Sequence, residues 1–174
     1  KLLEKIGVKT KFEGQEIKVF PASDVFSQSM VVESDWSSAS YYYSLIALSD
    51  VGSEVSLSSY TPDSLQGDAV LRDIYSHLGV QTTFKKDQLV LAKVAAPSDA
   101  ILEKGLAWDL SNAPDIAQTI AVSCFGLGVA CDLTGLHTLK IKETDRLVAL
   151  ENELSKLGAG LHITEKSLHL AAFN

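Results

Sequence analysis

The sequence has 174 residues, of which 46% are hydrophobic and 21% are charged, a composition typical of a soluble globular protein. Its 15 basic and 22 acidic residues give a net charge of −7, which argues against a broad surface for nucleic acid or anionic membrane, because such surfaces need clustered positive charge. We therefore expect no nucleic-acid or membrane partner, and any anion-binding site must be local.

The chain lacks the sequence features of an exported or membrane protein. No apolar run reaches the roughly 20 residues of a membrane span, and the first residues, KLLEKIGVKTKFEG, lack the hydrophobic core and cleavage site of a signal peptide. These features predict a cytoplasmic protein. Cys124 and Cys131 lie in the apolar stretch AVSCFGLGVACDL without a histidine at metal-ligand spacing, so we interpret them as buried hydrophobic residues and expect no metal site.

A pattern of helix end, glycine, strand, turn and strand occurs three times. Its copies are LLEKIGVKTKFEGQEIKV, LRDIYSHLGVQTTFKKDQLVL and LENELSKLGAGLHITEKSLHL, whose glycines Gly7, Gly79 and Gly158 recur at intervals of 72 and 79 residues. This period is too long for most solenoids and suits a tandem α/β subdomain. Because the chain starts inside the second helix of an earlier copy, we expect a fragment with at least one unit truncated upstream.

A complete unit has the predicted order strand, helix, strand, helix, strand, strand. In the first complete unit, MVVES (30–34) is strand-like and a helix begins near Ser37. SEVSLSSY (53–60) alternates as a strand, and AVLRDIYSHLG (69–79) is an amphipathic helix that Gly79 closes. DSLQGD, before this helix, is interpreted as its start.

The second complete unit repeats this order. LAWDL (106–110) is predicted as a strand and NAPD as a helix start, with Asn112 as the cap and Pro114 in the first turn. A second strand, a helix and a closing hairpin span 130–170. The predicted boundaries are those of the tail of one unit, a second unit and a third unit, at 1–28, 29–95 and 96–174.

The segment IKETDR (141–146) is the first candidate site. On a helix, Lys142 and Arg146 would share a face, and Glu143 and Arg146 would pair. Lys140 and Lys142 would oppose the helix dipole, which is easier to explain if an anionic ligand binds these cations and the free N–H groups. The alternative is an ordinary exposed helix start, and the pattern alone favours neither.

Asp115, in SNAPD, is the second candidate. An acidic residue in a first turn stabilises a helix by itself. The repeat, however, places the helix starts at Asp115 and Lys142 after consecutive strands. If these strands are parallel neighbours, both starts lie at the edge where α/β sheets bind ligands. The sequence then predicts a cation-rich pocket with two carboxylates available for proton transfer.

Taken in order, ESDWSSASYYY, DSLQGD, NAPD and KETDR resemble the 5-enolpyruvylshikimate-3-phosphate (EPSP) synthase family over essentially the whole chain. The resemblance implies an α/β (α+β) fold of tandem βαβαββ units, the enolpyruvyl transferase fold, as part of one domain with pseudo-threefold symmetry. It also implies a cofactor-free transfer of the enolpyruvyl group of phosphoenolpyruvate to the 5-hydroxyl of shikimate 3-phosphate, in aromatic amino acid biosynthesis.

The resemblance implies a role for each matching residue. Asp115 matches a candidate base near the 5-hydroxyl, and Lys142 matches a lysine that contacts shikimate 3-phosphate and helps to manage the same proton. Glu143 matches a glutamate that shuttles a proton at the phosphoenolpyruvate methylene. Arg146 matches an arginine that pairs with the phosphoenolpyruvate carboxylate, a bidentate task suited to guanidinium. Thr138 stands where many members have an asparagine that contacts the shikimate.

Other features of the family lack counterparts here. The serine pair Ser37 and Ser38 is similar to a phosphate site, but its neighbours match a helix start, so we expect helix caps there and at Asp35. The family's N-terminal lysine and later arginine and lysine are missing, so the isolated chain is expected to be inactive without the remaining domain of the same protein. We expect the full-length protein to be a monomer.

Two alternative functions remain open. The related enolpyruvyl transferase that acts on UDP-N-acetylglucosamine shares the fold but relies on a reactive cysteine. A non-catalytic repeat domain that mediates assembly or binds an anion passively would need no proton-transfer groups.

Overall fold

The structure is a computed structural model that describes residues 1–22, 29, 31–86 and 88–172. The chain divides into two compact units, Lys1–Val32 and Glu33–Asn174, which are described separately. No helix in the described ranges is long and apolar enough to cross a membrane.

The unit Lys1–Val32 contains a short helix and a hairpin. Helix α1 (Leu2–Lys5) is followed by Gly7, whose φ is +82°, and by the antiparallel strands β1 (Thr10–Glu13) and β2 (Glu16–Val19). This order of helix end, glycine, strand, turn and strand confirms the prediction for the first copy of the repeat.

The predicted strand at 30–34 is wrong for its described part. Met30 lies outside the described residues, and residues 31–34 form no strand. The side chains of Val31 and Val32 are 90% and 83% exposed, so no neighbouring strand covers them. The segment is held at its end instead, where the Ser34 N–H donates to the Ser59 carbonyl at 2.8 Å and the Glu33 carboxylate accepts from the Ser64 hydroxyl at 2.7 Å.

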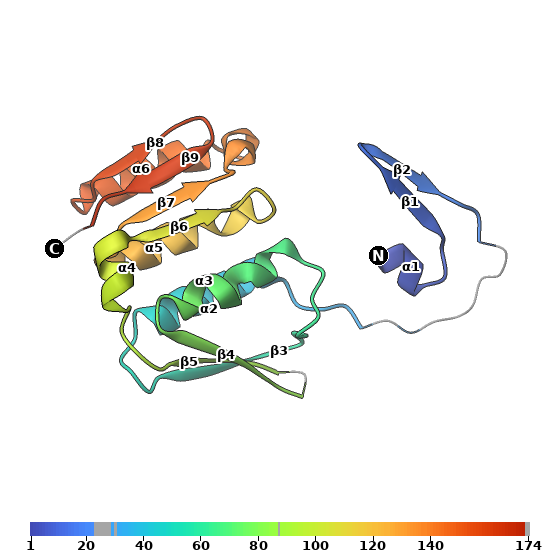
Figure 1. The fold of residues 1–174 in the computed structure, drawn as a ribbon, viewed down its shortest axis with the longest axis horizontal. Helices are drawn as coiled ribbons and strands as arrows, with labels where there is room; N and C mark the ends of the chain where they lie inside the picture. The colour runs from blue at the N-terminus through green and yellow to red at the C-terminus, as the bar shows by residue number, and fades with distance from the viewer. Residues whose placement is uncertain (23–28, 30, 87, 173–174) are drawn as a thin grey trace. The chain divides into compact units, whose positions relative to one another are not determined.

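The first half of the unit Glu33–Asn174 has helices on one face of an antiparallel sheet with the strand order β3-β5-β4 (Figure 1). Its elements are α2 (Trp36–Ala47), β3 (Glu54–Ser58), the 3-10 helix η1 (Gly67–Val70), α3 (Leu71–Ser76), β4 (Val80–Lys85) and β5 (Gln88–Lys93). The predicted helix near Ser37, the strand within 53–60 and the helix before Gly79 are therefore confirmed.

The second half builds a sheet with the order β6-β7-β9-β8, in which β6 and β7 are parallel and the other pairs are antiparallel. Its elements are α4 (Asp99–Lys104), β6 (Leu106–Asp109), η2 (Pro114–Ile116), α5 (Ala117–Gly126), β7 (Cys131–Thr134), η3 (His137–Ile141), α6 (Arg146–Lys156), β8 (Leu161–Ile163) and β9 (Ser167–Leu170). The predicted strand, helix and hairpin within 130–170 are confirmed.

Helices from the two halves share one core. Tyr75 of α3 is fully buried, and its hydroxyl lies 2.8 Å from the Ser123 hydroxyl of α5. Ser123 in turn donates to the Ser44 hydroxyl of α2 at 2.8 Å. These contacts join α2, α3 and α5, the helices that follow the candidate site, in one core.

The helix starts use different caps. Asp35 caps α2 by accepting a hydrogen bond from the Ser37 N–H at 2.9 Å. The predicted cap at Asn112 is wrong, because η2 begins after Ala113 without a side-chain cap. Pro114 opens η2 as predicted, since proline needs no N–H partner in a first turn.

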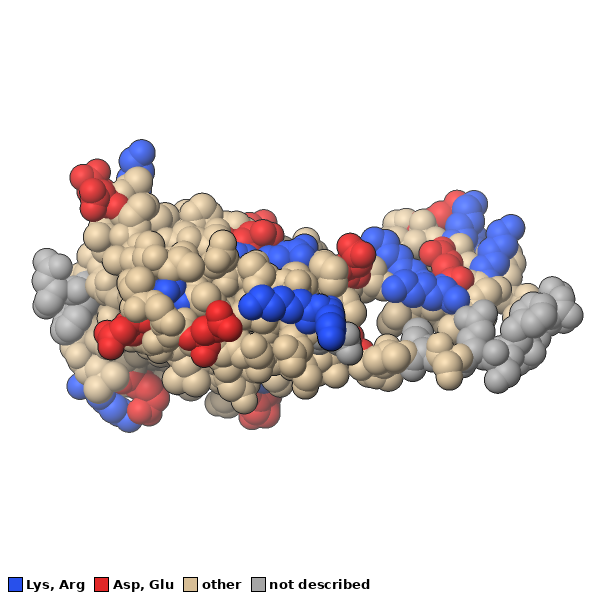
Figure 2. Space-filling model, turned by 90° about the horizontal axis from the view of Figure 1, so that it is seen from below, with Lys and Arg blue, Asp and Glu red and all other residues tan. Residues whose placement is uncertain are grey.

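Charged side chains of both signs are spread over the surface. On the face seen in Figure 2, basic and acidic residues of the unit Glu33–Asn174 stand singly or in pairs of opposite sign. In the hairpin of the other unit, Lys11 and Lys18 both pair with Glu13, at 2.6 and 3.6 Å.

Candidate active site

The site forms at the carboxyl ends of two parallel strands. In the β6–β7 pair, Asp109 lies opposite Thr134, and each strand leads into a 3-10 helix. The two connections carry Asp115 and Lys142, whose side chains lie 2.9 Å apart, so the predicted proximity of these two residues is confirmed. Adjacent parallel strands deliver their following segments to one edge, which is where open α/β sheets place ligands.

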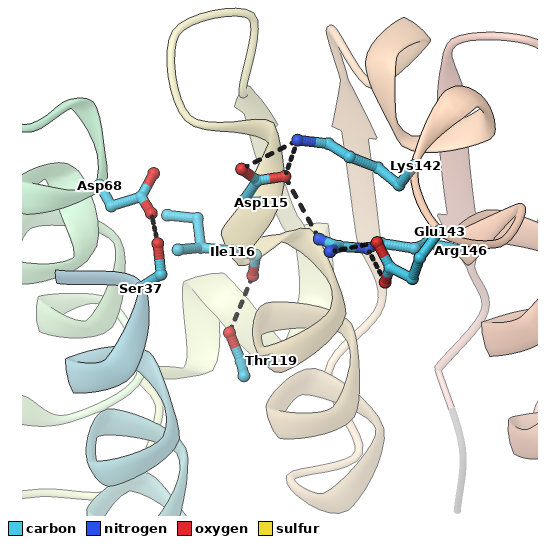
Figure 3. Close-up of polar contacts among 8 residues, drawn as sticks. All are labelled: Ser37, Asp68, Asp115, Ile116, Thr119, Lys142, Glu143 and Arg146. Atoms are coloured by element: carbon cyan, nitrogen blue, oxygen red, sulfur yellow. Dashed lines mark hydrogen bonds and ion pairs between the residues drawn. The ribbon is translucent and has the colours of Figure 1, made fainter. Parts of the chain in front are cut away.

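Two cations converge on the Asp115 carboxylate (Figure 3). Lys142 Nζ lies 2.9 Å from Oδ1 and 3.2 Å from Oδ2, and Arg146 Nη1 lies 3.3 Å from Oδ1. The side chains of Lys142, Arg146 and Asp115 are 31%, 25% and 38% exposed, so this cluster is only partly screened by water. An anionic ligand can therefore reach cations whose positions are already fixed.

Arg146 also forms a bidentate ion pair with Glu143. Its Nε lies 2.9 Å from Oε1, and its Nη2 lies 3.0 Å from Oε2 of Glu143. These hydrogen bonds hold the pKa of Glu143 below its ordinary value and raise the pKa of Arg146. The pairing predicted from the spacing of the two residues is confirmed. It also shows that the guanidinium presents its planar edge to a carboxylate.

The expected helical geometry of IKETDR is wrong. Helix α6 begins only at Arg146, with Asp145 as the N-cap that accepts from the N–H groups of Leu147 and Val148 at 3.1 and 3.2 Å. Lys142 has an extended conformation before the helix, so it shares no helical face with Arg146. The two cations meet because the chain bends back toward Asp115.

The predicted opposition of Lys140 and Lys142 to the helix dipole is wrong for the same reason. Lys140 belongs to η3, and its Nζ lies 2.6 Å from the Glu165 carboxylate. Neither Lys140 nor Lys142 is in the first turn of α6. The convergence of Lys142 and Arg146 on Asp115 now supports an anion site in place of that argument.

A pocket of about 530 Å³ opens beside the charged cluster. Its lining residues come from α2, η2, α5, the segment before α6, and α6 itself: Ser37, Ser40, Tyr41, Asp115, Gln118, Thr119, Glu143, Arg146, Ala149, Leu150 and Glu153. Thr119 closes the first turn of α5 with a hydroxyl that donates to the Ile116 carbonyl at 2.9 Å (Figure 3). The lining of the pocket thus combines charged side chains with side chains that carry hydroxyl groups.

Thr138 lies outside this lining. It sits in η3, and its Oγ1 is buried without a hydrogen-bond partner among the described residues. A buried hydroxyl without a partner is costly. Its predicted contact with a substrate stays a prediction.

Ser37 and Asp68 are site residues that the sequence did not reveal. The hydroxyl of Ser37, expected to be a cap, instead makes a short hydrogen bond with Asp68 Oδ2, while its backbone N–H bonds Asp35. Asp68 lies in η1, whose start at DSLQGD was predicted. The absence of cations from DSLQGD left no sequence signal that Asp68 contacts Ser37, a residue of the pocket lining.

The two cysteines are buried, as predicted. Cys124 and Cys131 have free thiols that are 0% and 1% exposed. Its hydrogen bond with Cys131, together with burial, raises the pKa of the Cys124 thiol, which disfavours the reactive thiolate. Within the part of the chain that the structure describes, no group of three or more His, Cys, Asp or Glu residues could hold a metal ion.

Comparisons with known proteins agree on one family. The sequence model described as EPSP synthase (3-phosphoshikimate 1-carboxyvinyltransferase) matches residues 1–172. A 3-phosphoshikimate 1-carboxyvinyltransferase of Bacteroides fragilis is 40% identical over 137 residues, covering 79% of this chain and 32% of the relative. One from Buchnera aphidicola is 34% identical over 165 residues, covering 91% of this chain and 35% of the relative.

A solved structure shares the fold. The structure of EPSP synthase from Acinetobacter baumannii superposes with a TM-score of 0.70 at 20% identity, covering 98% of this chain and 39% of that one. The expected fold class is thereby confirmed. The chain spans about a third of the length of the curated relatives it matches.

Proposed function

Because this chain belongs to the EPSP synthase family, we propose that it serves as one part of a 3-phosphoshikimate 1-carboxyvinyltransferase. The full-length enzyme would transfer the enolpyruvyl group of phosphoenolpyruvate to the 5-hydroxyl of shikimate 3-phosphate. The observation that carries the proposal is the convergence of Lys142 and Arg146 on the Asp115 carboxylate at the edge of two parallel strands. Both substrates are anions, and fixed cations beside carboxylates suit their binding and proton transfer.

Arg146 is proposed to bind the phosphoenolpyruvate carboxylate. Its planar edge already pairs with the Glu143 carboxylate, and a substrate carboxylate has the same shape. When the substrate takes this edge, Glu143 loses the hydrogen bonds that lower its pKa. The pKa of Glu143 then rises, and the residue becomes able to carry a proton.

Asp115 and Glu143 are proposed to move the protons. The oxygen of the 5-hydroxyl bonds to C2 of phosphoenolpyruvate while its proton passes to Asp115, next to Lys142. The methylene carbon accepts a proton from Glu143, which gives a tetrahedral adduct. Cleavage of the C–O bond to phosphate, with return of one methyl proton to Glu143, restores the double bond. The leaving phosphate takes up the proton held by Asp115, so that both carboxyl groups return to their starting states.

The rest of the enzyme is proposed to come from the same polypeptide. We propose that the remaining domain supplies further groups that hold the phosphates, so that this chain alone shows no transferase activity. Measurable turnover by the purified chain would contradict this. The units 29–95 and 96–174, a cytoplasmic location and a monomeric full-length protein belong to the same proposal.

The first test separates binding from turnover in the full-length protein. Asp115→Asn removes the proposed base, so we expect phosphate release to be lost while calorimetry still detects binding of shikimate 3-phosphate. Glu153→Gln is the matched control, because Glu153 lines the pocket but pairs with Lys156 at 2.6 Å. If Asp115→Asn leaves turnover unchanged, Asp115 is not the base. That result would favour the alternative in which this part of the protein binds an anion passively.

A second test addresses the transferase that uses UDP-N-acetylglucosamine. That enzyme relies on a reactive cysteine, whereas both thiols here are buried. We therefore expect phosphate release by the full-length protein to be insensitive to a thiol-alkylating reagent. Loss of activity on alkylation of either cysteine would favour the alternative.

A further inference from the structure

A hydroxyl and a carboxyl group form a pair on the side of the pocket opposite the KETDR residues. Ser37 lies in the first turn of α2 and lines the same pocket as Asp115 and Arg146. Its Oγ donates a hydrogen bond to Asp68 Oδ2. Figure 3 shows this pair beside the side chain of Ile116, with Asp115 beyond it. None of the proposed steps of the reaction uses Ser37 or Asp68.

The surrounding turn holds the pair in place. The Gln66 side chain accepts a hydrogen bond from the Trp36 N–H at 2.9 Å and donates to the Ser34 carbonyl at 2.8 Å. Gly67 packs so closely that an added Cβ would lie 2.1 Å from the Asn112 carbonyl oxygen. Asp68 is therefore held against the start of α2 by contacts on both sides, and its geometry toward Ser37 is fixed.

The surroundings of Asp68 raise the pKa of its carboxyl group above the ordinary value. Burial raises the pKa of Asp68, and the nearby carboxylates Asp115 and Asp35 raise it further, while the hydrogen bond to Ser37 and the charge of Lys142 lower it. An ionised Asp68 accepts the only proton of the Ser37 hydroxyl. A protonated Asp68 donates to Ser37 Oγ instead and leaves the hydroxyl proton free to point into the pocket.

We propose that Ser37 donates a hydrogen bond to an anionic oxygen of a bound substrate, and that Asp68 is the positioning residue that supplies the proton for this arrangement. The proposal rests on the proposed function, since it assigns a further contact to the same anionic substrates. The oxygen belongs either to the phosphate of shikimate 3-phosphate or to phosphoenolpyruvate. Because Asp68 must be protonated in the complex, substrate binding is coupled to the uptake of one proton.

The test uses the full-length protein with three variants, two substrates and a pH series. We expect Ser37→Ala to raise KM and the calorimetric Kd roughly tenfold or more for one of the two substrates, because hydrogen bonds to charged groups are among the stronger ones. The value of kcat should change little. Ser38→Ala is the matched control, since Ser38 bonds only Asp35 among the contacts described and does not line the pocket.

Asp68→Asn distinguishes a role of Asp68 in positioning the Ser37 hydroxyl from a role in supporting the local structure. An asparagine amide donates to Ser37 at every pH, so we expect near-normal binding that no longer weakens as pH rises. In the unsubstituted protein, binding should weaken with rising pH relative to this variant, because Asp68 must first regain its proton. The comparison cancels the titration of the substrate phosphate, which is common to both proteins.

The outcomes distinguish the two proposals. Unchanged KM and Kd for both substrates in Ser37→Ala would overturn the role of the hydroxyl. Equal pH dependence in Asp68→Asn and the unsubstituted protein would overturn the role of Asp68. A folded full-length protein that binds neither substrate would refute the proposed function itself.

Discussion

Gly67→Ala tests whether the contact between η1 and the SNAPD loop sets the position of Asp115. The added Cβ would lie 2.1 Å from the Asn112 carbonyl oxygen and 3.2 Å from its carbonyl carbon. Ordinary van der Waals contacts are well beyond the first distance, so the backbone of one segment must move by about 1 Å or more. Overpacking of this kind costs about 1–3 kcal/mol. The Tm should fall by roughly 2–4 °C for each kcal/mol.

The same displacement should lower the rate. Asn112 lies three residues before Asp115, so a shift of this loop moves the carboxylate relative to Lys142 Nζ, 2.9 Å away. A misplacement of about 1 Å can cost about a hundredfold in rate. We therefore expect Gly67→Ala to lower kcat for phosphate release by the full-length protein by roughly one to two orders of magnitude.

Gly160→Ala is the matched control. A Cβ at Gly160 would meet only the Cβ of Ala171, at 3.4 Å, an ordinary contact. Thermal unfolding followed by circular dichroism and a phosphate-release assay measure both effects. If Gly67→Ala matches Gly160→Ala in Tm and kcat, the tight contact does not exist and the reasoning about Asp115 fails.

Three further changes have defined outcomes. Asp145→Ala removes the acceptor for two N–H groups of α6, so the free energy of unfolding in urea should fall by about 1 kcal/mol. Arg146→Gln removes the hydrogen bonds that lower the pKa of Glu143, so a carboxyl NMR titration should show this pKa rising. Tyr75→Phe removes a buried hydroxyl bonded to Ser123 and should cost about 1 kcal/mol in the free energy of unfolding.

The Arg146–Glu143 pair also has a defined dependence on pH. Because the folded-state pKa of Glu143 is lowered, its stabilising contribution is present above the pKa of the unfolded chain and is lost as pH falls through the lowered value. The stability difference between the parent and Arg146→Gln should therefore shrink on acidification. An unchanged NMR pKa of Glu143 in the variant, or a difference that grows toward acid, would contradict this.

The repeat and its glycines predicted most of the fold because they report local geometry. Gly79 and Gly158 have φ values of +81° and +91° and end their helices, as their place in the repeat indicated. The prediction that Asp115 and Lys142 meet depended only on two consecutive strands being parallel neighbours. The structure places β6 and β7 in that relation.

The errors concern one local helix cap and two features that depend on distant partners. MVVES has the composition of a strand, yet Val31 and Val32 remain exposed because nothing in the described chain pairs with them. The spacing of KETDR predicted a helix, but Asp145 accepts hydrogen bonds from two backbone N–H groups as the N-cap, so the helix begins only at Arg146. The Ser37–Asp68 contact joins residues that are 31 positions apart in the sequence, and nothing in the types of these residues predicts the contact.

The most direct test of the central claim is phosphate release by the full-length protein with shikimate 3-phosphate and phosphoenolpyruvate, measured beside its Glu143→Gln variant. Glutamine keeps the shape of Glu143 but cannot carry the proton to and from the methylene carbon. We predict turnover in the parent and its loss in the variant, with substrate binding retained. Equal turnover in both proteins, or none in a folded parent, would contradict the proposed role of Glu143.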